Sequence, residues 1–168
     1  RFVGTDLDDT FDGSGVSAPL EYEPGLGNDT VIGGDGFDTI VFGDGDLSVN
    51  LLATYAQLTG EGRDKLVDIE NIIAGSGNDY LKGDDRDNRI EAGSGNDVVL
   101  ARGGDDVLIG GLGNDRLDGG AGNDTAIFGD GSVKVNLSRS WKINSGEGLD
   151  ALKNIENVIS GSGDDWLK

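Results

Sequence analysis

The sequence of 168 residues contains no cysteine, no histidine and only 2 prolines. The lack of cysteine excludes a disulfide framework, thiol chemistry and zinc sites of the CxxC type. The lack of histidine removes the usual general base, and it leaves the serines without the partner that activates a nucleophile. Carboxylates are numerous enough to suggest a glycosidase pair at many positions, but their repetition has a structural explanation. We therefore expect a chain that is not an enzyme and has no catalytic residues.

Basic residues are also scarce, since 13 Lys and Arg stand against 32 Asp and Glu, for a net charge of −19. Nucleic acid binding needs a basic surface, so nucleic acid is not an expected partner. No apolar run is long enough to span a membrane. Such a composition is typical of disorder, but a hydrophobic content of 35% with regularly spaced aliphatic residues argues against it. The like charges oppose compaction unless cations neutralise them.

Glycine, with 31 residues, is abundant, and it recurs in a nonapeptide Gly-Gly-x-Gly-x-Asp-x-U-x in which U is a large aliphatic residue. The clearest matches are residues 33–41 and 110–118, followed by 119–127 with a smaller Ala126 at U. Near-matches in the same phase begin at Pro24, Ala74, Gly83, Ala92, Ala101 and Ser160, and weaker ones at Thr59 and Ser145. In the Gly83 unit, Arg86 replaces a glycine and Asn88 replaces the aspartate.

A longer period of about 86 residues lies over the nonapeptides, and it relates two stretches of the chain to each other. Residues 33–51 align without gaps on 119–137, and residues 60–82 align on 146–168. We expect an irregular leading segment with one degenerate repeat at 1–23, a first module at 24–109, and a second, truncated module of the same solenoid at 110–168.

Each unit contains a turn and a short strand. Glycine supplies the positive φ angles that tight turns need, and Asn and Asp tolerate them. In the x-U-x segment, U points inward and its neighbours point outward. Two units make a coil of about 18 residues, so the sequence predicts an all-β parallel roll with a thin core. The expected core residues are Val31, Ile40, Leu81, Ile90, Val99, Leu108, Leu117 and Leu167.

Stacked turns would bring one aspartate of each coil into line, and carboxylates in register repel one another. A hard cation converts that repulsion into ligation, because calcium takes six to eight oxygens from carboxylates and carbonyls. The absence of His and Cys disfavours zinc and copper, and no loop shows the EF-hand spacing. We predict several Ca²⁺ ions in rows. The expected rows are Asp79, Asp97 and Asp115, with Asp64 extending it, and Asp106 with Asp124.

These units resemble the repeats-in-toxin (RTX) family of haemolysin-type nonapeptide repeats. The resemblance implies a right-handed parallel β-roll or β-helix with Ca²⁺ in its turns. It also implies a bacterial protein exported by the type I secretion machinery to the medium or the cell surface. The parent could be a toxin, protease, lipase, epimerase, adhesin or surface-layer protein, so the module is compatible with an accessory role in a secreted enzyme or toxin.

In the family, the aspartate of position six and backbone carbonyls of the turn bind the ion. The resemblance assigns this role to Asp29, Asp38, Asp79, Asp97, Asp106, Asp115, Asp124 and Asp165, and in weaker units to Asp64 and Asp150. The matching turn glycines are Gly25, Gly27, Gly34, Gly36, Gly75, Gly77, Gly93, Gly95, Gly111, Gly113, Gly120, Gly122, Gly161 and Gly163. Asn88 departs from the pattern, which puts its site in doubt.

Four aromatic residues occupy equivalent positions in the two modules: Tyr55 with Trp141, and Tyr80 with Trp166. Exposed aromatics can stack on sugars or protein partners, or they can cover the edge of a thin solenoid. The first interpretation gives the alternative function, an adhesin or lectin-like module that binds a glycan or a cell-surface component in a calcium-dependent way.

Overall fold

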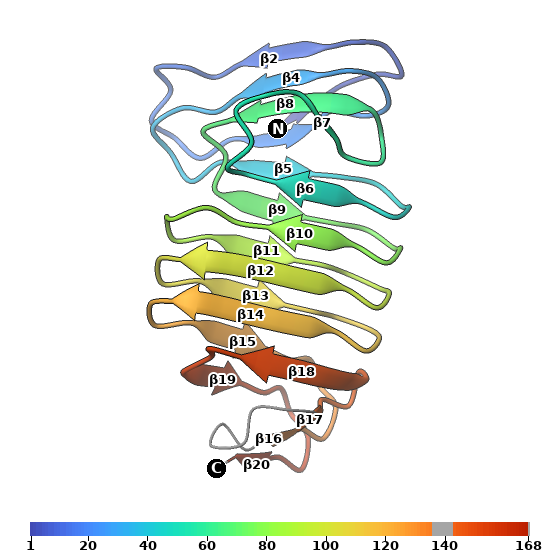
Figure 1. The fold of residues 1–168 in the computed structure, drawn as a ribbon, viewed down its shortest axis with the longest axis vertical. Coiled ribbons are helices and arrows are strands. Elements are labelled where there is room, and N and C mark those ends of the chain that lie inside the picture. The colour runs from blue at the N-terminus through green and yellow to red at the C-terminus, as the bar shows by residue number, and fades with distance from the viewer. Residues whose placement is uncertain (136–142, 168) are drawn as a thin grey trace.

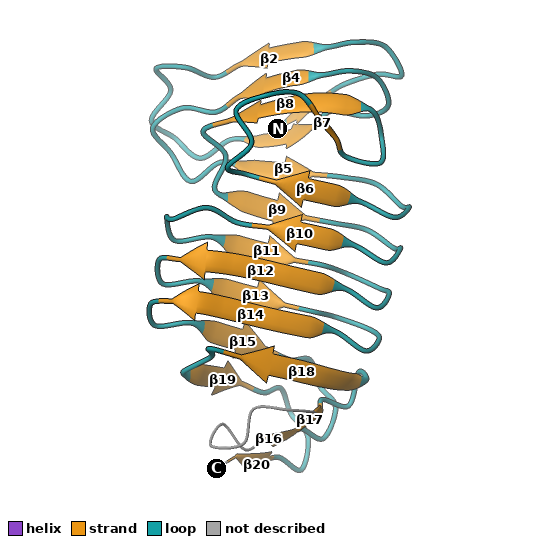
Figure 2. Ribbon diagram, in the orientation of Figure 1, coloured by secondary structure: helices purple, strands orange, loops and turns teal. Residues whose placement is uncertain are grey.

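The computed structural model describes residues 1–135 and 143–167. In this part of the chain 20 β-strands are present and no helix, so no helix here could cross a membrane. The strands stack into a long parallel β-roll, with the C-terminal strands at its far end (Figure 1). Turns and loops line both edges of the roll (Figure 2). The all-β roll expected from the repeats is confirmed.

One face of the roll is a parallel sheet of eight strands in the order β1-β3-β5-β9-β11-β13-β15-β19. Its strands are β1 (Phe2–Val3), β3 (Glu21–Glu23), β5 (Thr39–Val41), β9 (Asn71–Ile73), β11 (Arg89–Glu91), β13 (Val107–Ile109), β15 (Thr125–Ile127) and β19 (Asn157–Ile159). Strands β11 and β13 pair with Ile90 opposite Leu108, which are 18 residues apart, so two units form one coil.

The other face is divided into two sheets, in the orders β2-β4-β8-β7 and β20-β16-β17-β18-β14-β12-β10-β6. The smaller sheet contains β2 (Thr10–Asp12), β4 (Thr30–Ile32), β7 (Gln57–Leu58) and β8 (Arg63–Val67). The larger sheet contains β6 (Ser48–Asn50), β10 (Tyr80–Lys82), β12 (Val98–Gly103), β14 (Arg116–Ala121), β16 (Lys134–Val135), β17 (Ile143–Asn144), β18 (Leu149–Lys153) and β20 (Trp166–Leu167).

A back-folded hairpin interrupts the regular coils once in each module. Strand β7 runs antiparallel to β8, and β8 returns to pair with the earlier strand β4, while β6 pairs with β10. The same pairings recur as β17 with β18, β18 with β14, and β16 with β20. The hairpin inserts a strand out of sequence order, so the residues of this strand have other neighbours than a regular coil would give them.

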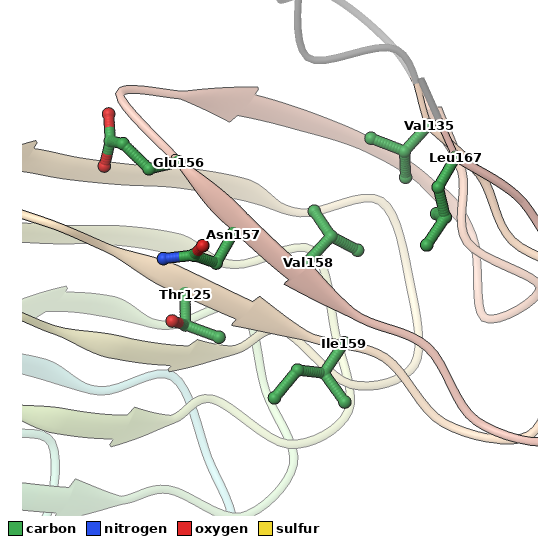
Figure 3. A pocket seen from close by; sticks show the side chains of 7 residues that line it. All are labelled: Thr125, Val135, Glu156, Asn157, Val158, Ile159 and Leu167. Carbon is green, nitrogen blue, oxygen red and sulfur yellow. The ribbon is translucent and has the colours of Figure 1, made fainter.

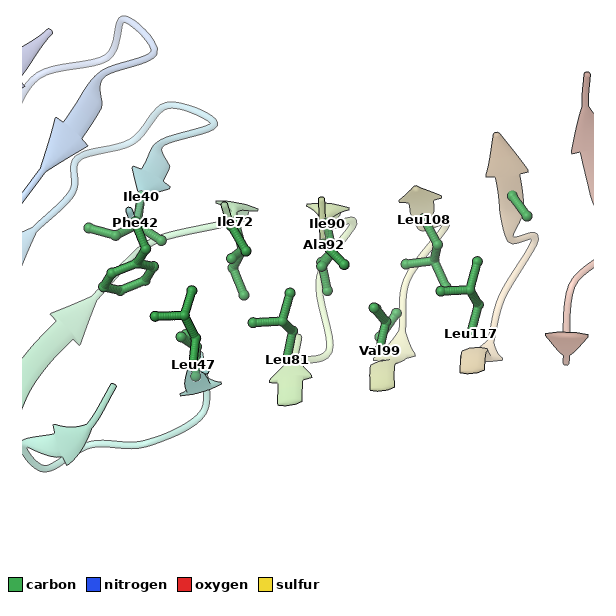
Figure 4. Close-up of a cluster of buried hydrophobic side chains, with 14 of the residues drawn as sticks. Ile40, Phe42, Leu47, Ile72, Leu81, Ile90, Ala92, Val99, Leu108 and Leu117 are labelled. Carbon is green, nitrogen blue, oxygen red and sulfur yellow. The ribbon is translucent and has the colours of Figure 1, made fainter. Parts of the chain in front are cut away.

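The core consists of two facing rows of inward-pointing apolar side chains, one row from each face of the roll (Figure 4). All of the expected core residues except Leu167 are completely buried, including Leu81, Val99 and Leu117. The prediction for Leu167 is wrong, because this residue is 49% exposed. One buried aliphatic residue contributes only about 1.5–3 kcal/mol, less than the backbone entropy lost in ordering nine residues. Burial alone therefore does not hold a coil.

The turns of successive coils touch through their backbones. A Cβ atom added at Gly95, where φ is 152°, would lie 1.6 Å from the carbonyl oxygen of Gly77 in the preceding coil. The same atom at Gly113 would lie 1.5 Å from the oxygen of Gly95. Glycine is required at these positions both for the φ angle and for the close approach.

We predict that Gly95→Ala strongly destabilises the roll, because the methyl group would displace a stacked carbonyl. Gly45→Ala is the matched control: its φ is 127°, but an added Cβ meets no atom within 4 Å. The control should lose only the backbone strain of about 1–3 kcal/mol. Thermal unfolding of both variants in calcium measures the difference, and equal melting temperatures would contradict the stacking argument.

Candidate metal sites

A hydrogen-bonded row of aspartates runs along one edge of the roll. The backbone N–H of Asp79 donates to Oδ1 of Asp97 (2.8 Å), Asp97 N–H donates to Asp115 (2.9 Å), and Asp115 N–H donates to Asp150 (2.9 Å). Each carboxylate is thus oriented by the neighbouring coil. The expected row of Asp79, Asp97 and Asp115 is confirmed as an arrangement in space.

The prediction that Asp64 extends this row is wrong. Asp64 lies in a separate short row, where its Oδ1 accepts from Asp29 N–H (2.9 Å) and Oδ1 of Asp29 accepts from Asp9 N–H (2.7 Å). The cause is the hairpin, which returns β8 to pair with β4. Asp150 ends the long row instead, because β18 pairs with β14.

The second long row lies along the opposite edge, since the strands of the two faces run in opposite directions (Figure 1). Asn88 N–H donates to Oδ1 of Asp106 (2.7 Å), and Asp106 N–H donates to Asp124 (2.9 Å), as the sequence predicted for the aspartate pair. Glutamates were missed: Glu156 accepts from Asp124 N–H, and Glu70 accepts from Asp38 N–H, both at 2.9 Å. The repeated Ile-Glu-Asn triplet was the signal that could have identified them.

The second oxygen of many of these carboxylates is buried without a hydrogen-bond partner among the described residues. This holds for Oδ2 of Asp29, Asp79, Asp97, Asp106, Asp115 and Asp124. Burying a carboxylate oxygen in this way is costly unless a cation or donor compensates it. All of these residues were predicted as metal ligands from their position in the repeat.

Backbone carbonyls of the glycine turns are further oxygens that a cation at such a site could use. Gly75, Gly93 and Gly111 stack in one line, as do Gly77, Gly95 and Gly113, with their carbonyl groups against the next coil. Within the described residues no three acidic side chains converge on one point, so carboxylates alone cannot form the site. A few carboxylate oxygens among many carbonyls fit calcium, which accepts both. The donor set does not fit zinc or copper.

The comparison with known families agrees with this geometry. A family model described as the RTX calcium-binding nonapeptide repeat matches residues 25–46, 73–108 and 100–132, in 4 copies. The chain carries RTX calcium-binding repeats. No curated protein matches the chain significantly. Every aspartate with an unpaired buried oxygen lies inside the matched segments, so the RTX repeats form a calcium-binding structural module.

Burial raises the pKa of these aspartates in the absence of metal. Burial is the main cause of the shift, and the pKa of Asp79 is raised to about 6 and the pKa values of Asp106 and Asp115 are raised to about 7. Neighbouring carboxylates add to the effect, with Asp150 and Asp97 acting on Asp115 and Asp124 acting on Asp106. The RTX turns therefore hold carboxylates that favour either a proton or a cation near neutral pH.

Other predicted ligand residues are paired within the protein. Oδ2 of Asp38 accepts from Gly34 N–H (2.6 Å), and the hydroxyl groups of Thr59 and Ser145 hydrogen-bond the carboxylates of Asp64 and Asp150. Asp165 is exposed, and it accepts from Val133 N–H (2.9 Å). Ligation of calcium by these four residues, like ligation by the other predicted aspartates, stays a prediction.

The predicted turn glycines have different neighbours in different parts of the roll. Gly120 and Gly122 lie against the carbonyls of Arg102 and Gly104, and Gly161 and Gly163 against those of Gly129 and Gly131. In the leading part, Gly25 and Gly27 lie against Thr5 and Leu7, and Gly34 and Gly36 against Val16 and Ala18. The leading segment therefore presents few glycine carbonyls to its neighbours.

A hollow of about 600 Å³ at the far end of the roll explains the exposure of Leu167 (Figure 3). It is lined mainly by Val135, Val158, Ile159 and Leu167, from β16, β19 and β20. The equivalent residues Ile72 and Leu81 in the first module are completely buried, because β11 and β12 pair beside them. The hollow is thus core surface that no further described coil covers.

We predict that protons can partly replace calcium in these turns. The raised pKa values mean that the folded chain without calcium binds more protons than the unfolded chain between pH 3.8 and about 7. Its proton-linked stability is full below that window and declines as pH rises through it, so folding should depend most strongly on calcium above about pH 7. Circular dichroism in EDTA at about pH 5 and about pH 8 measures this effect: the β-structure signal should be larger at the lower pH, and equal signals would contradict the prediction.

Proposed function

We propose that the chain is a calcium-responsive structural module of a larger exported bacterial protein. It would stay unfolded at low cytosolic calcium, leave the cell through type I secretion, and fold in the calcium-rich medium or at the cell surface. The unpaired buried carboxylate oxygens carry this proposal. The division into a leading segment 1–23 and modules 24–109 and 110–168 belongs to it, and the repeated strand pairings of β4–β10 and β14–β20 support it.

The charge balance explains why folding should require the metal. The net charge of −19 opposes compaction. The apolar burial in the narrow core does not compensate the conformational entropy lost in ordering many glycines. Calcium supplies positive charge where the rows concentrate negative charge. Metal binding is then folding free energy, as in other small metal-dependent modules. We expect an affinity of roughly 10⁻⁴ to 10⁻³ M per ion, as in extracellular calcium modules.

Far-ultraviolet circular dichroism should show an unfolded chain in excess EDTA and β-structure when calcium is added. Calorimetry on two variants tests the rows: Asp97→Ala should weaken two adjacent sites, because the Asp97 carboxylate stands between those of Asp79 and Asp115 in the row. Asp165→Ala is the control at the exposed end. A native-like β signal in EDTA would refute the proposed function, whereas equal loss of bound calcium from both variants would refute only the row arrangement.

A second candidate function is glycan binding, and a hollow of about 410 Å³ beside the hairpin favours it. Tyr55 (68% exposed) and Tyr80 (39% exposed) line it together with Arg63 and Lys82. Aromatic faces and hydrogen-bonding groups in one hollow suit a sugar ring. The Lys82 ammonium lies 4.6 Å from the centre of the Tyr80 ring, so Tyr55 offers the freer face. Its counterpart Trp141 lies outside the described residues.

A glycan array probed in calcium separates the two candidates. Binding to a glycan should be lost in Tyr55→Ala and kept in Phe37→Ala, an exposed aromatic residue (59%) in a different turn. Binding that survives Tyr55→Ala would place the glycan elsewhere. A wild-type chain that binds no glycan on the array would remove this candidate.

A further inference from the structure

One turn in the second row differs from its neighbours in composition and in backbone conformation. The turn at residues 83–88 connects β10 to β11, and Arg86 stands where the repeat has a glycine. The corresponding glycines in the next two coils, Gly104 and Gly122, have φ angles of 107° and 147°. Arg86 is not among the residues with positive φ. The turn therefore does not have the backbone of the glycine turns that follow it.

The Arg86 side chain reaches back to the acidic residues of the preceding coil. Its Nη1 lies 2.5 Å from Oε1 of Glu70 and 3.9 Å from Oδ1 of Asp68, and its Nε lies 2.8 Å from Oδ2 of Asp84. Glu70 and Asp84 are only 3% and 4% exposed. A guanidinium group thus joins two buried carboxylates from two coils, which is the role of the metal ion in an RTX turn.

The Asn88 amide completes this arrangement. Its Nδ2 donates to the backbone carbonyl of Glu70 (2.9 Å) and to Oδ1 of Asp84 (3.1 Å), and its Oδ1 accepts from Asp84 N–H (2.8 Å). An aspartate at this position could not donate either bond. The carbonyl of Glu70, an oxygen of the kind that calcium would bind, is therefore already used.

The next coil differs from this turn in whether its buried side-chain oxygens have hydrogen-bond partners. Oδ2 of Asp106, the following residue in the row, has no hydrogen-bond partner in the described part of the chain. No buried side-chain oxygen of Glu70, Asp84 or Asn88 is left without one. An exposed ion pair contributes little, but removing one partner of a buried pair leaves an uncompensated charge. The carboxylates of Glu70 and Asp84 that Arg86 contacts are buried, so removing Arg86 would leave their charges uncompensated.

We propose that the Arg86 guanidinium and the Asn88 amide replace a calcium ion in this turn. The turn at residues 83–88 is then held without a metal ion. It interrupts the second row between Asp38 and Asp106. The first row, in contrast, continues from Asp79 through Asp97 to Asp115. The chain contains an internal cation in the middle of its RTX repeats. This inference rests on calcium binding by the other turns.

The double variant Arg86→Gly/Asn88→Asp restores the repeat and tests the proposal. Native mass spectrometry and calorimetry in saturating calcium should give one more bound ion per chain than the wild type. An unchanged ion count in a variant that circular dichroism shows to be folded would overturn the proposal. A wild-type chain that binds no calcium would instead refute the proposed function, so the two failures are distinguishable.

A single substitution keeps the test decisive if the double variant does not fold. Arg86→Ala leaves Glu70 and Asp84 without their cation, so the calcium concentration at the midpoint of folding should rise by about tenfold. Arg89→Ala is the matched control, because Arg89 pairs with Glu91 at the partly exposed surface of its own strand. Its midpoint should stay within about twofold of wild type. Equal midpoints for the two variants would overturn the proposal.

Discussion

Most RTX turns place a carboxylate where the neighbouring coil supplies one backbone hydrogen bond, and where the second carboxylate oxygen is buried. At Asp97, Oδ1 accepts from Asp79 N–H, while Oδ2 is buried without a partner among the described residues. The aspartate cannot move outward without breaking the bond to the preceding coil, and its ionised form is costly in place unless a cation compensates it. The stacking of coils and the need for positive charge are thus consequences of one geometry.

This geometry also explains why the chain can be so poor in hydrophobic core. A coil contributes about one inward aliphatic residue from each strand, such as Leu81 or Ile90, and these form two narrow facing rows rather than a broad packed layer. The backbone contacts between glycine turns are too close for any side chain, so they add rigidity but bury little apolar surface. Ligation in the turns then replaces the apolar burial that a domain of this length normally uses.

The sequence predicted what depends on the regular period and failed where the chain leaves it. The spacing of 18 residues gave the register of Leu81, Val99 and Leu117, because a strict repeat permits only one stacking. The row of Asp64 was wrong, since the return of β8 to β4 depends on hairpin packing that no period describes. The role of Arg86 was missed because a degenerate repeat shows only that a ligand is lost, and not what replaces it.

Glu70 and Glu156 continue the rows of acidic side chains where the hairpin stands in place of a regular turn. The carboxylates of Glu70 and Glu156 each accept a hydrogen bond from the N–H of an aspartate in an earlier coil, at 32 residues' separation instead of 18. The two are equivalent in sequence but not in environment: Glu70 is buried beside Arg86, whereas Glu156 is exposed. The burial of Glu70 therefore comes from the coil that stacks on it, and in that coil Arg86 supplies the positive charge that compensates the buried carboxylate.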